Sequence, residues 1–298
     1  MHTICLKDNW TLTVLGKNVY HIPETPIETK VPSTVYGTLL EKGLIPDPFY
    51  RDNELDALKL MENDFAYETT IVISEEDRKA DRLFLHFDGI DTIADVYLNG
   101  EKIGSADNMN RVWEYDITDL VAGDAADTVY QVKVVLHSPT KFIAEEEAKC
   151  PVGAASDAMP GFPHIRKAAC MYGWDWGPRL VTSGIWRPVY LEGWSGARIS
   201  DVFYRQQEVT ARRARVEVEV EIASVRDLAE AVVTVASPGE GIEASVTAPL
   251  RSGINKVTVP LDIASPKLWW TRELGEPHLY EFRASVAAGD ASDSRTTR

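Results

Sequence analysis

The sequence predicts an all-β protein built from two consecutive β-sandwich domains, and three observations carry the prediction. From residue 65 onward, β-branched and aromatic residues recur with a period of two, which is the repeat of a strand with one buried face. These runs are short and end in turn residues, which is typical of a sandwich or jelly roll. The composition shifts near residue 194. About seven further strands over about a hundred residues then favour an immunoglobulin-like sandwich.

The chain begins with a segment that is poor in strands. Residues 3–13 predict an opening strand. Residues 33–43 predict one short helix, with Ser33 as its N-cap and Gly43 as its C-cap. The prolines that follow end this helix, and residues 52–60 are expected to add another helical turn.

The middle of the first domain predicts a run of strands. They are expected over residues 65–73, 82–87, 94–98, 112–115 and 130–137. Asn99 and Gly100 predict a tight type I′ hairpin, because both residues tolerate positive φ angles.

Residues 139–185 break this pattern with five prolines and several glycines, which predicts an irregular insertion. An insertion of this length is usually functional or disordered, and its many aromatic residues argue against disorder. A strand over residues 186–192 then closes the first domain, which we place at residues 1–194.

The second domain is expected to span residues 195–298. Val218, Val220 and Ile222 alternate with glutamates, which predicts a strand with one buried face. The polar residues at the end of the chain are expected to form part of a last strand that the chain does not complete. Further strands are expected over residues 232–236, 242–248, 256–261 and 280–287.

The charge balance limits the partners of the protein. The formal net charge is −15 and the sequence pI is about 4.9, which disfavours nucleic acids and anionic membrane surfaces. No basic segment followed by an apolar one opens the chain, and no apolar run approaches the length of a membrane span. We therefore expect a cytoplasmic protein with no nucleic-acid partner and no membrane partner.

Metal and cofactor binding are not expected. Cys150, His164 and Cys170 lie close in sequence, but they lack a fourth ligand and the spacing of a zinc site. Three cysteines without a Cys-x-x-Cys pair fit a reducing compartment. No glycine-rich loop joins a strand to a helix, as phosphate binding would require. The prediction is that the chain holds no metal and no cofactor.

One loop carries the most informative chemistry in the chain. Trp174 and Trp176 flank Asp175, between glycines that let the backbone turn sharply. A carboxylate accepts two sugar hydroxyls at once, and an indole covers the C–H face of a pyranose. Arg166 or Arg179 could orient the carboxylate. The alternative is a loop anchored by buried indoles with Asp175 capping backbone amides, and the residue types alone leave both interpretations open.

Catalysis by this chain alone is not predicted. Glycosidases place two carboxyl groups about 5–9.5 Å apart in a cleft, and no convincing second carboxylate accompanies Asp175. Asp88, Asp91 and Asp95 share one strand–turn–strand segment, where we interpret them as solvated turn residues. We find no serine-nucleophile elbow and no zinc-hydrolase motif.

Residues 82–100 and 110–120 closely resemble the sugar-binding, galactose-binding-like jelly roll of glycoside hydrolase family 2. β-Galactosidases, β-glucuronidases and β-mannosidases share these motifs, which therefore indicate the family and not the substrate. Residues 166–178, followed by residues 184–189, resemble the β-mannosidase branch in particular. In that branch the Trp-Asp-Trp-Gly loop reaches from the jelly roll into the active site of the catalytic barrel.

The resemblance implies roles for single residues. Asp175 would bind sugar hydroxyls and Trp174 would line the pocket, while Trp176 fits a structural role equally well. Arg166 completes the expected set of substrate-binding residues.

The resemblance also covers the second domain. Residues 266–270 and 277–280 resemble the end of the family's sandwich domain, although residues 271–274 replace its usual turn. In the family, the two catalytic glutamates lie on a TIM barrel that follows this sandwich. The resemblance therefore implies the non-catalytic N-terminal part of a retaining β-mannosidase, inactive by itself. Its implied partners are a β-mannoside or related oligosaccharide and a C-terminal TIM barrel.

Other functions remain open at this point. A free carbohydrate-binding protein would bind sugar without the barrel. An interaction module would use an exposed apolar surface to pair with a separate barrel chain, or with a second copy as a homodimer. A family 2 β-galactosidase or β-glucuronidase is the alternative with a different substrate.

Overall fold

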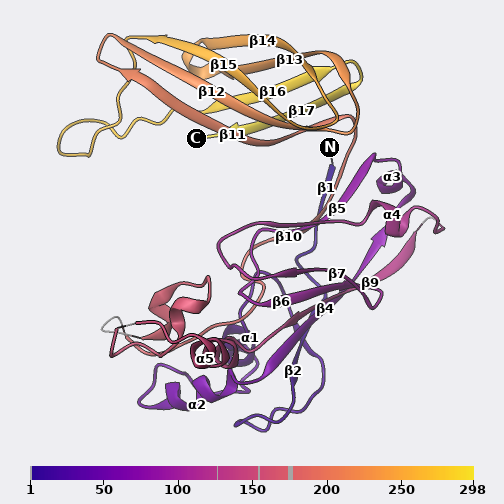
Figure 1. Cartoon of the computed structure of the whole chain (residues 1–298), viewed down its shortest axis with the longest axis vertical. Helices are drawn as coiled ribbons and strands as arrows, with labels where there is room; N and C mark the ends of the chain where they lie inside the picture. The colour runs from indigo at the N-terminus through magenta and orange to yellow at the C-terminus, as the bar shows by residue number, and fades with distance from the viewer. Residues whose placement is uncertain (1, 126, 154, 174–176) are drawn as a thin grey trace. The chain divides into compact units, whose positions relative to one another are not determined.

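The computed structural model describes residues 2–125, 127–153, 155–173 and 177–298. The chain divides into two compact units, and Figure 1 shows that strands dominate both of them. The first unit comprises residues 3–79 and 83–192, and the second comprises residues 193–298 together with His2 and residues 80–82. The prediction of an all-β fold is confirmed.

The first unit is a sandwich of two sheets. Its larger sheet has the strand order β3-β2-β4-β9-β6-β7, and its smaller sheet has the order β1-β10-β5-β8. The inward-facing side chains form one apolar core that includes the buried Trp10, Phe65 and Tyr67. The strands are β1 (His2–Cys5), β2 (Trp10–Leu15), β3 (Ile27–Thr29), β4 (Asp64–Ile73), β5 (Arg82–Phe87), β6 (Ala94–Leu98), β7 (Glu101–Ala106), β8 (Trp113–Asp116), β9 (Thr128–Leu136) and β10 (Val189–Trp194).

The hairpin predicted between β6 and β7 is present. Asn99 has a φ of 48° and Gly100 a φ of 85°, which are the positive values that a type I′ turn requires. The Asn99 side chain also accepts a hydrogen bond of 2.8 Å from the backbone amide of Gln131 on β9, so the turn is fixed to the neighbouring strand.

Three of the helices, α1, α2 and α5, lie at one end of the first unit (Figure 1). The N-cap of α1 is Thr34 and not the predicted Ser33, because the Thr34 hydroxyl accepts a hydrogen bond of 3.1 Å from the Gly37 amide. The helices are α1 (Val35–Glu41), α2 (Asn53–Leu60), α3 (Glu75–Arg78), α4 (Thr118–Val121) and α5 (Pro139–Lys149), with the 3-10 turns η1 (Phe162–His164) and η2 (Ala169–Tyr172).

Helix α5 corrects the prediction that residues 139–185 are irregular throughout. Ser138 caps the helix by accepting a hydrogen bond of 3.1 Å from the Lys141 amide. Pro139 occupies the first turn, where its missing amide hydrogen costs nothing. Ile143 is fully buried in the core. The proline that was expected to mark irregular structure starts a helix.

The second unit is also a sandwich, with sheets of order β11-β12-β15 and β14-β13-β16-β17. The predicted alternation in β12 is confirmed, because Val218, Val220 and Ile222 are fully buried. The polar residues near the end of the chain form β17, which pairs antiparallel with β16. The elements are β11 (Ala197–Val209), β12 (Arg213–Ser224), β13 (Leu228–Ser237), η4 (Pro238–Glu240), β14 (Ile242–Leu250), β15 (Gly253–Ala264), β16 (Phe282–Ala288) and β17 (Ala291–Thr297).

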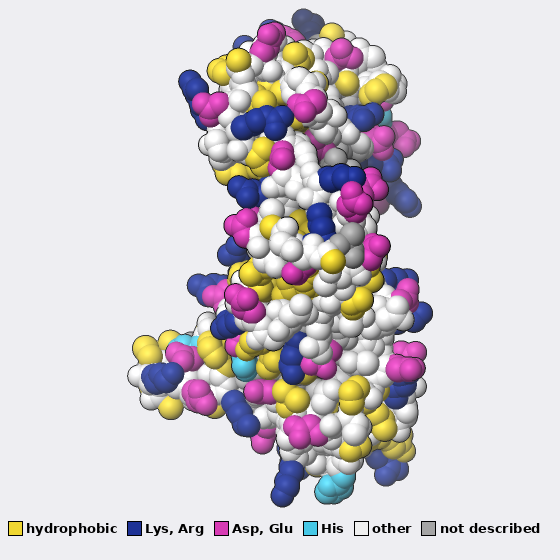
Figure 2. Space-filling model, turned by 90° about the vertical axis from the view of Figure 1, so that its right-hand side faces the viewer, with side chains coloured by type: hydrophobic (Ala, Val, Ile, Leu, Met, Phe, Trp, Pro, Cys, Tyr) yellow, Lys and Arg dark blue, Asp and Glu magenta, His cyan; other side chains and the backbone are white. Residues whose placement is uncertain are grey.

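The charged side chains of the surface carry both signs. Figure 2 shows acidic and basic side chains interspersed on the face in view. Among the described residues, no helix combines the length and the apolar character needed to cross a membrane.

Candidate functional site

The central residues of the predicted sugar loop, Trp174, Asp175 and Trp176, lie outside the described residues. The glycines on either side are described. Gly173 has a φ of 98° and Gly177 a φ of 137°, so the backbone flanking these three residues adopts conformations that favour glycine. The roles assigned to the three residues remain predictions.

Two described segments lead to and from these residues. We name residues 166–173 the first arm and residues 177–185 the second arm. Arg166 opens the first arm, where its carbonyl accepts a hydrogen bond of 3.0 Å from the Met109 amide. Its side chain is exposed, and Nη1 lies 3.7 Å from Oδ2 of Asp107. The structure therefore places Arg166 beside Asp107, and its contact with substrate remains a prediction.

The two arms pack on each other near Gly173. A Cβ on this glycine would lie 2.8 Å from Cγ of Arg179, so the first arm rests directly on a side chain of the second. Gly173 forms a β-bridge with Ala158, and the Arg179 guanidinium donates a hydrogen bond of 3.0 Å to the Asp157 carbonyl. Ala158 thereby contacts the first arm, and its neighbour Asp157 contacts the second.

Away from Gly173, both arms contact the buried carboxylate of Asp91, a residue that is 1% exposed. From the first arm, Nζ of Lys167 donates to both carboxylate oxygens. From the second arm, the Thr182 hydroxyl donates a hydrogen bond of 2.7 Å to Oδ2. The Ser183 hydroxyl donates to the Asp91 carbonyl at 3.1 Å, and Asp91 exchanges two backbone hydrogen bonds with Gly184.

Lys167 is held in the interior of the first unit by this carboxylate. Its side chain is fully buried, and burial lowers the pKa of the ammonium group while the adjacent Asp91 opposes that shift. A buried charge is tolerated only when it is paired and hydrogen-bonded. The Asp91–Lys167 ion pair meets this condition, because Thr182 also lies within 3.1 Å of Nζ.

The interpretation of Asp88, Asp91 and Asp95 as solvated turn residues is wrong for Asp91, which is buried. Asp88 is partly buried and accepts a hydrogen bond of 3.3 Å from the Tyr190 hydroxyl. The signal that could have identified Asp91 is its place in an apolar segment, between Ile90 and Thr92-Ile93. A charged residue in such a segment must find a buried partner.

Asp95 is partly buried as well, and its carboxylate has several partners. Burial raises the pKa of Asp95, but hydrogen bonds to the charged form outweigh this effect and lower the pKa to about 2. The partners are Lys102 at 2.6 Å, Ser105 at 2.7 Å and His137 at 3.1 Å.

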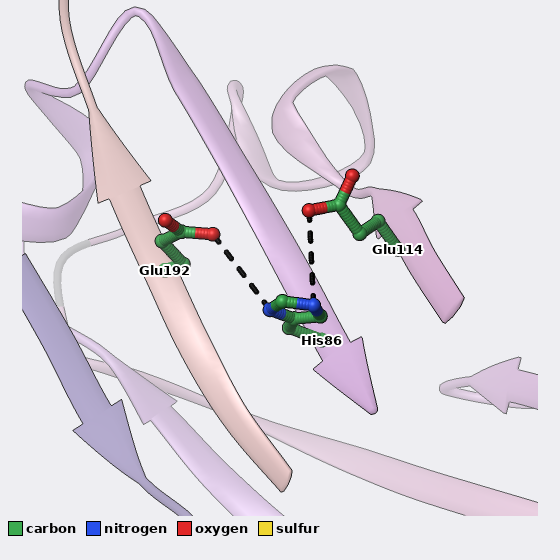
Figure 3. A group of neighbouring side chains, drawn as sticks. All are labelled: His86, Glu114 and Glu192. Carbon is green, nitrogen blue, oxygen red and sulfur yellow. Dashed lines mark ion pairs between the residues drawn. The ribbon is translucent and has the colours of Figure 1, made fainter. Parts of the chain in front are cut away.

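A second cluster of polar side chains lies on three adjacent strands of the smaller sheet (Figure 3). His86 on β5 stands directly opposite Glu114 on β8, with Nε2 3.7 Å from the carboxylate. Glu192 on β10 lies 3.8 Å from Nδ1. One nitrogen of His86 and one carboxylate oxygen of each glutamate lie within 4.8 Å of one another, and atoms of these types can bind a metal ion. Each carboxylate faces a different ring nitrogen, however, which favours separate contacts with the two nitrogens over chelation around one of them.

Cys150, His164 and Cys170, which lie close in sequence, have different surroundings in the structure. Nε2 of His164 lies 3.0 Å from the carboxylate of Glu147 on α5, and both cysteines are exposed. This histidine is engaged in an ion-pair geometry with a residue that the sequence did not single out.

The second unit contains an open hollow of about 600 Å³. Two segments singled out in the sequence meet there, since Trp269 forms an antiparallel β-bridge with Pro277. Trp269 and Trp270 line the hollow and are 56% and 48% exposed. The hollow is mainly apolar, with stacked rings of Tyr280 and Phe282 in its wall.

Comparisons with known proteins agree with this architecture. Residues 10–187 match the profile of the glycosyl hydrolase 2 galactose-binding domain-like family, and residues 197–298 match that of glycosyl hydrolases family 2. The beta-mannosidase B of Thermothelomyces thermophilus is 32% identical over 262 residues, which are 88% of this chain and 30% of that protein. The beta-mannosidase B of Aspergillus flavus is 32% identical over 264 residues, with coverage of 87% and 30%.

Solved structures of glycoside hydrolases have the same fold over the length of this chain. The beta-D-mannosidase of Dictyoglomus thermophilum superimposes with a TM-score of 0.86 and 31% identity, covering 99% of this chain and 36% of that one. The exo-chitosanase of Amycolatopsis orientalis, at 18% identity and a TM-score of 0.72, shares the fold. The chain spans about 30% of the length of the curated relatives it matches. With both units matched by its profiles, the chain, a galactose-binding-like jelly roll followed by an immunoglobulin-like sandwich, belongs to glycosyl hydrolase family 2.

Proposed function

We propose that this chain is the non-catalytic N-terminal part of a retaining β-mannosidase that hydrolyses terminal β-D-mannosides. In this proposal the jelly roll supplies a recognition loop for the sugar, with Asp175, Trp174, Trp176 and Arg166 as its substrate-binding residues. The observation that carries the proposal is the match to proteins named beta-mannosidase, at 31–32% identity over most of the chain.

The surroundings of the loop support a role in recognition. A binding residue needs a rigid support, because misplacement by about 1 Å costs much of its effect. Both arms of the loop rest on the buried carboxylate of Asp91, and Arg179 packs across Gly173. Such anchoring suits a loop that presents a carboxylate and two indoles to a pyranose.

The proposed division of labour follows from the chemistry. Retaining hydrolysis needs an acid/base and a nucleophile whose carboxyl groups lie about 5–5.5 Å apart beside the glycosidic bond. We assign both groups to a catalytic domain outside residues 1–298. The loop would then act by holding the sugar against that domain, which lowers the entropic part of the barrier.

Substrate preference tests the proposal. Hydrolysis of aryl β-mannoside, β-galactoside and β-glucuronide is measured for the 298-residue chain and for a chain extended by the downstream reading frame. We expect the extended chain to prefer the mannoside by at least about 100-fold, and the short chain to be inactive. Hydrolysis by the short chain, or preference of the extended chain for another sugar, would overturn the proposal.

A further inference from the structure

The two arms of the loop reach the jelly roll at one carboxylate. Lys167 lies 76 residues from Asp91 in sequence and Thr182 lies 91 residues away, yet both donate to the same side chain. A single residue in the connection between β5 and β6 therefore fixes two segments of a distant insertion.

Asp91 forms hydrogen bonds with both arms. Its carboxylate accepts from the Lys167 ammonium on the first arm and from the Thr182 hydroxyl on the second. Its backbone pairs with Gly184, and its carbonyl accepts from Ser183. Hydrogen bonds to a buried charged group are stronger than those between neutral groups and restrict side-chain rotation. Asp91 is thus a shared and directional anchor.

The outer polar contact of the second arm is a weaker constraint. Arg179 is exposed, and its hydrogen bond to the Asp157 carbonyl competes with water. By contrast, Asp91 and Lys167 are removed from solvent. The placement of the second arm should therefore depend on the buried anchor more than on the Arg179 hydrogen bond.

We propose that Asp91 is a positioning residue, which sets the affinity of the loop for sugar through Lys167 and Thr182 without touching the sugar itself. The link to sugar rests on the proposed function, whereas the anchoring of the arms does not. Lys167 positions the first arm and Thr182 positions the second.

Hydrogen–deuterium exchange of the 298-residue chain tests the anchoring. Lys167→Met is expected to speed amide exchange at least tenfold in residues 168–173, and Thr182→Val to do so in residues 177–183. Asp91→Asn is expected to affect both arms. The matched control is Glu68→Gln, which removes a carboxylate that lies 3.0 Å from Lys133 between β4 and β9, and it should leave both arms unchanged. Equal acceleration throughout the first unit in all variants would overturn the proposal.

A double variant separates anchoring from simple stability. Asp91→Asn combined with Lys167→Met leaves no uncompensated buried charge, so the urea midpoint should return close to that of the original chain. The arms should nevertheless keep their faster exchange, because no charged anchor remains. Slow exchange in this variant would contradict the positioning role.

A cycle of variants in the extended chain tests the link to sugar. If Asp91 acts through the loop, Asp91→Asn should lower kcat/KM for the aryl β-mannoside about tenfold and raise KM. Added to Asp175→Ala it should cause no further loss. Additive losses would overturn the link. If Asp175→Ala itself has no effect while the exchange pattern holds, the proposed function of the loop fails and the anchoring stands.

Discussion

Removal of Lys167 alone should destabilise the first unit strongly. In Lys167→Met the Asp91 carboxylate remains buried, with hydroxyl donors but without its cation. Breaking a buried ion pair by removing one partner costs about 3–5 kcal/mol. With a urea m-value of about 2–3 kcal/mol/M, the unfolding midpoint of this unit should fall by about 1.5 M.

Urea unfolding followed by circular dichroism and tryptophan fluorescence measures this effect. The chain has two compact units, so two transitions are fitted and only the first unit's transition should shift. Glu68→Gln is the control, because its partly exposed ion pair with Lys133 contributes about 0–1 kcal/mol. A shift below about 0.3 M for Lys167→Met would refute the assignment of a buried, charged anchor.

Three further predictions follow from single positions. Asp95→Asn should cost about 1 kcal/mol at pH 7, after allowance for solvent screening. The pKa of Asp95 is lowered to about 2, so its contribution is present above about pH 4 and is lost as the pH falls through about 2. Urea midpoints at pH 7, 4 and 2.5 should therefore show a difference from the original chain that is clearly smaller at pH 2.5 than at pH 7, and a constant difference would contradict this expectation. Gly184→Ala should destabilise the first unit by more than about 2 kcal/mol, because the new Cβ would lie 2.5 Å from a backbone carbonyl oxygen, whereas Gly123→Ala meets no atom within 4 Å and should be nearly neutral in the same assay. Val220→Ala should lower the free energy of unfolding of the second unit alone, by about 2 kcal/mol, because it leaves a cavity in the core. Val232→Ala, at a position that is 40% exposed, should change this free energy little, and equal effects of the two substitutions would contradict the assignment of the core.

The strands were predictable because their signals are local. In β12, burial of one face imposes a period of two that the sequence displays directly, and Val218 and Val220 are buried as expected. At the β6–β7 turn, Asn99 and Gly100 are the residues that tolerate positive φ. Each of these features depends on a few consecutive residues.

Helix α5 was missed because the effect of proline on a helix depends on its position. In a helix interior it breaks the hydrogen-bond pattern, but at the first position it is favoured. Ser138 before Pro139 was the available sign of a helix start. The density of prolines and glycines downstream obscured that sign.

Asp91 was misjudged because its partners are distant in sequence. Lys167 and Thr182 reach it from the insertion, 76 and 91 residues away. The spacing of apolar residues and the residue types in turns contain no information about an ion pair between residues so far apart in sequence. The sequence indicated which loop carries the candidate site, but it did not indicate what holds that loop.

The most direct test of the proposed function is the effect of Asp175→Ala on sugar preference in the extended chain. The steady-state kcat/KM is measured for aryl β-mannoside and aryl β-galactoside, with Asp119→Ala as a control at an exposed aspartate in α4. A site built to hydrogen-bond sugar hydroxyls loses much of its discrimination when one partner is removed. We expect kcat/KM to fall about 100-fold or more on the mannoside, to fall less on the galactoside, and to stay unchanged in the control. An Asp175→Ala variant that retains full activity and preference for the mannoside would contradict the proposed function.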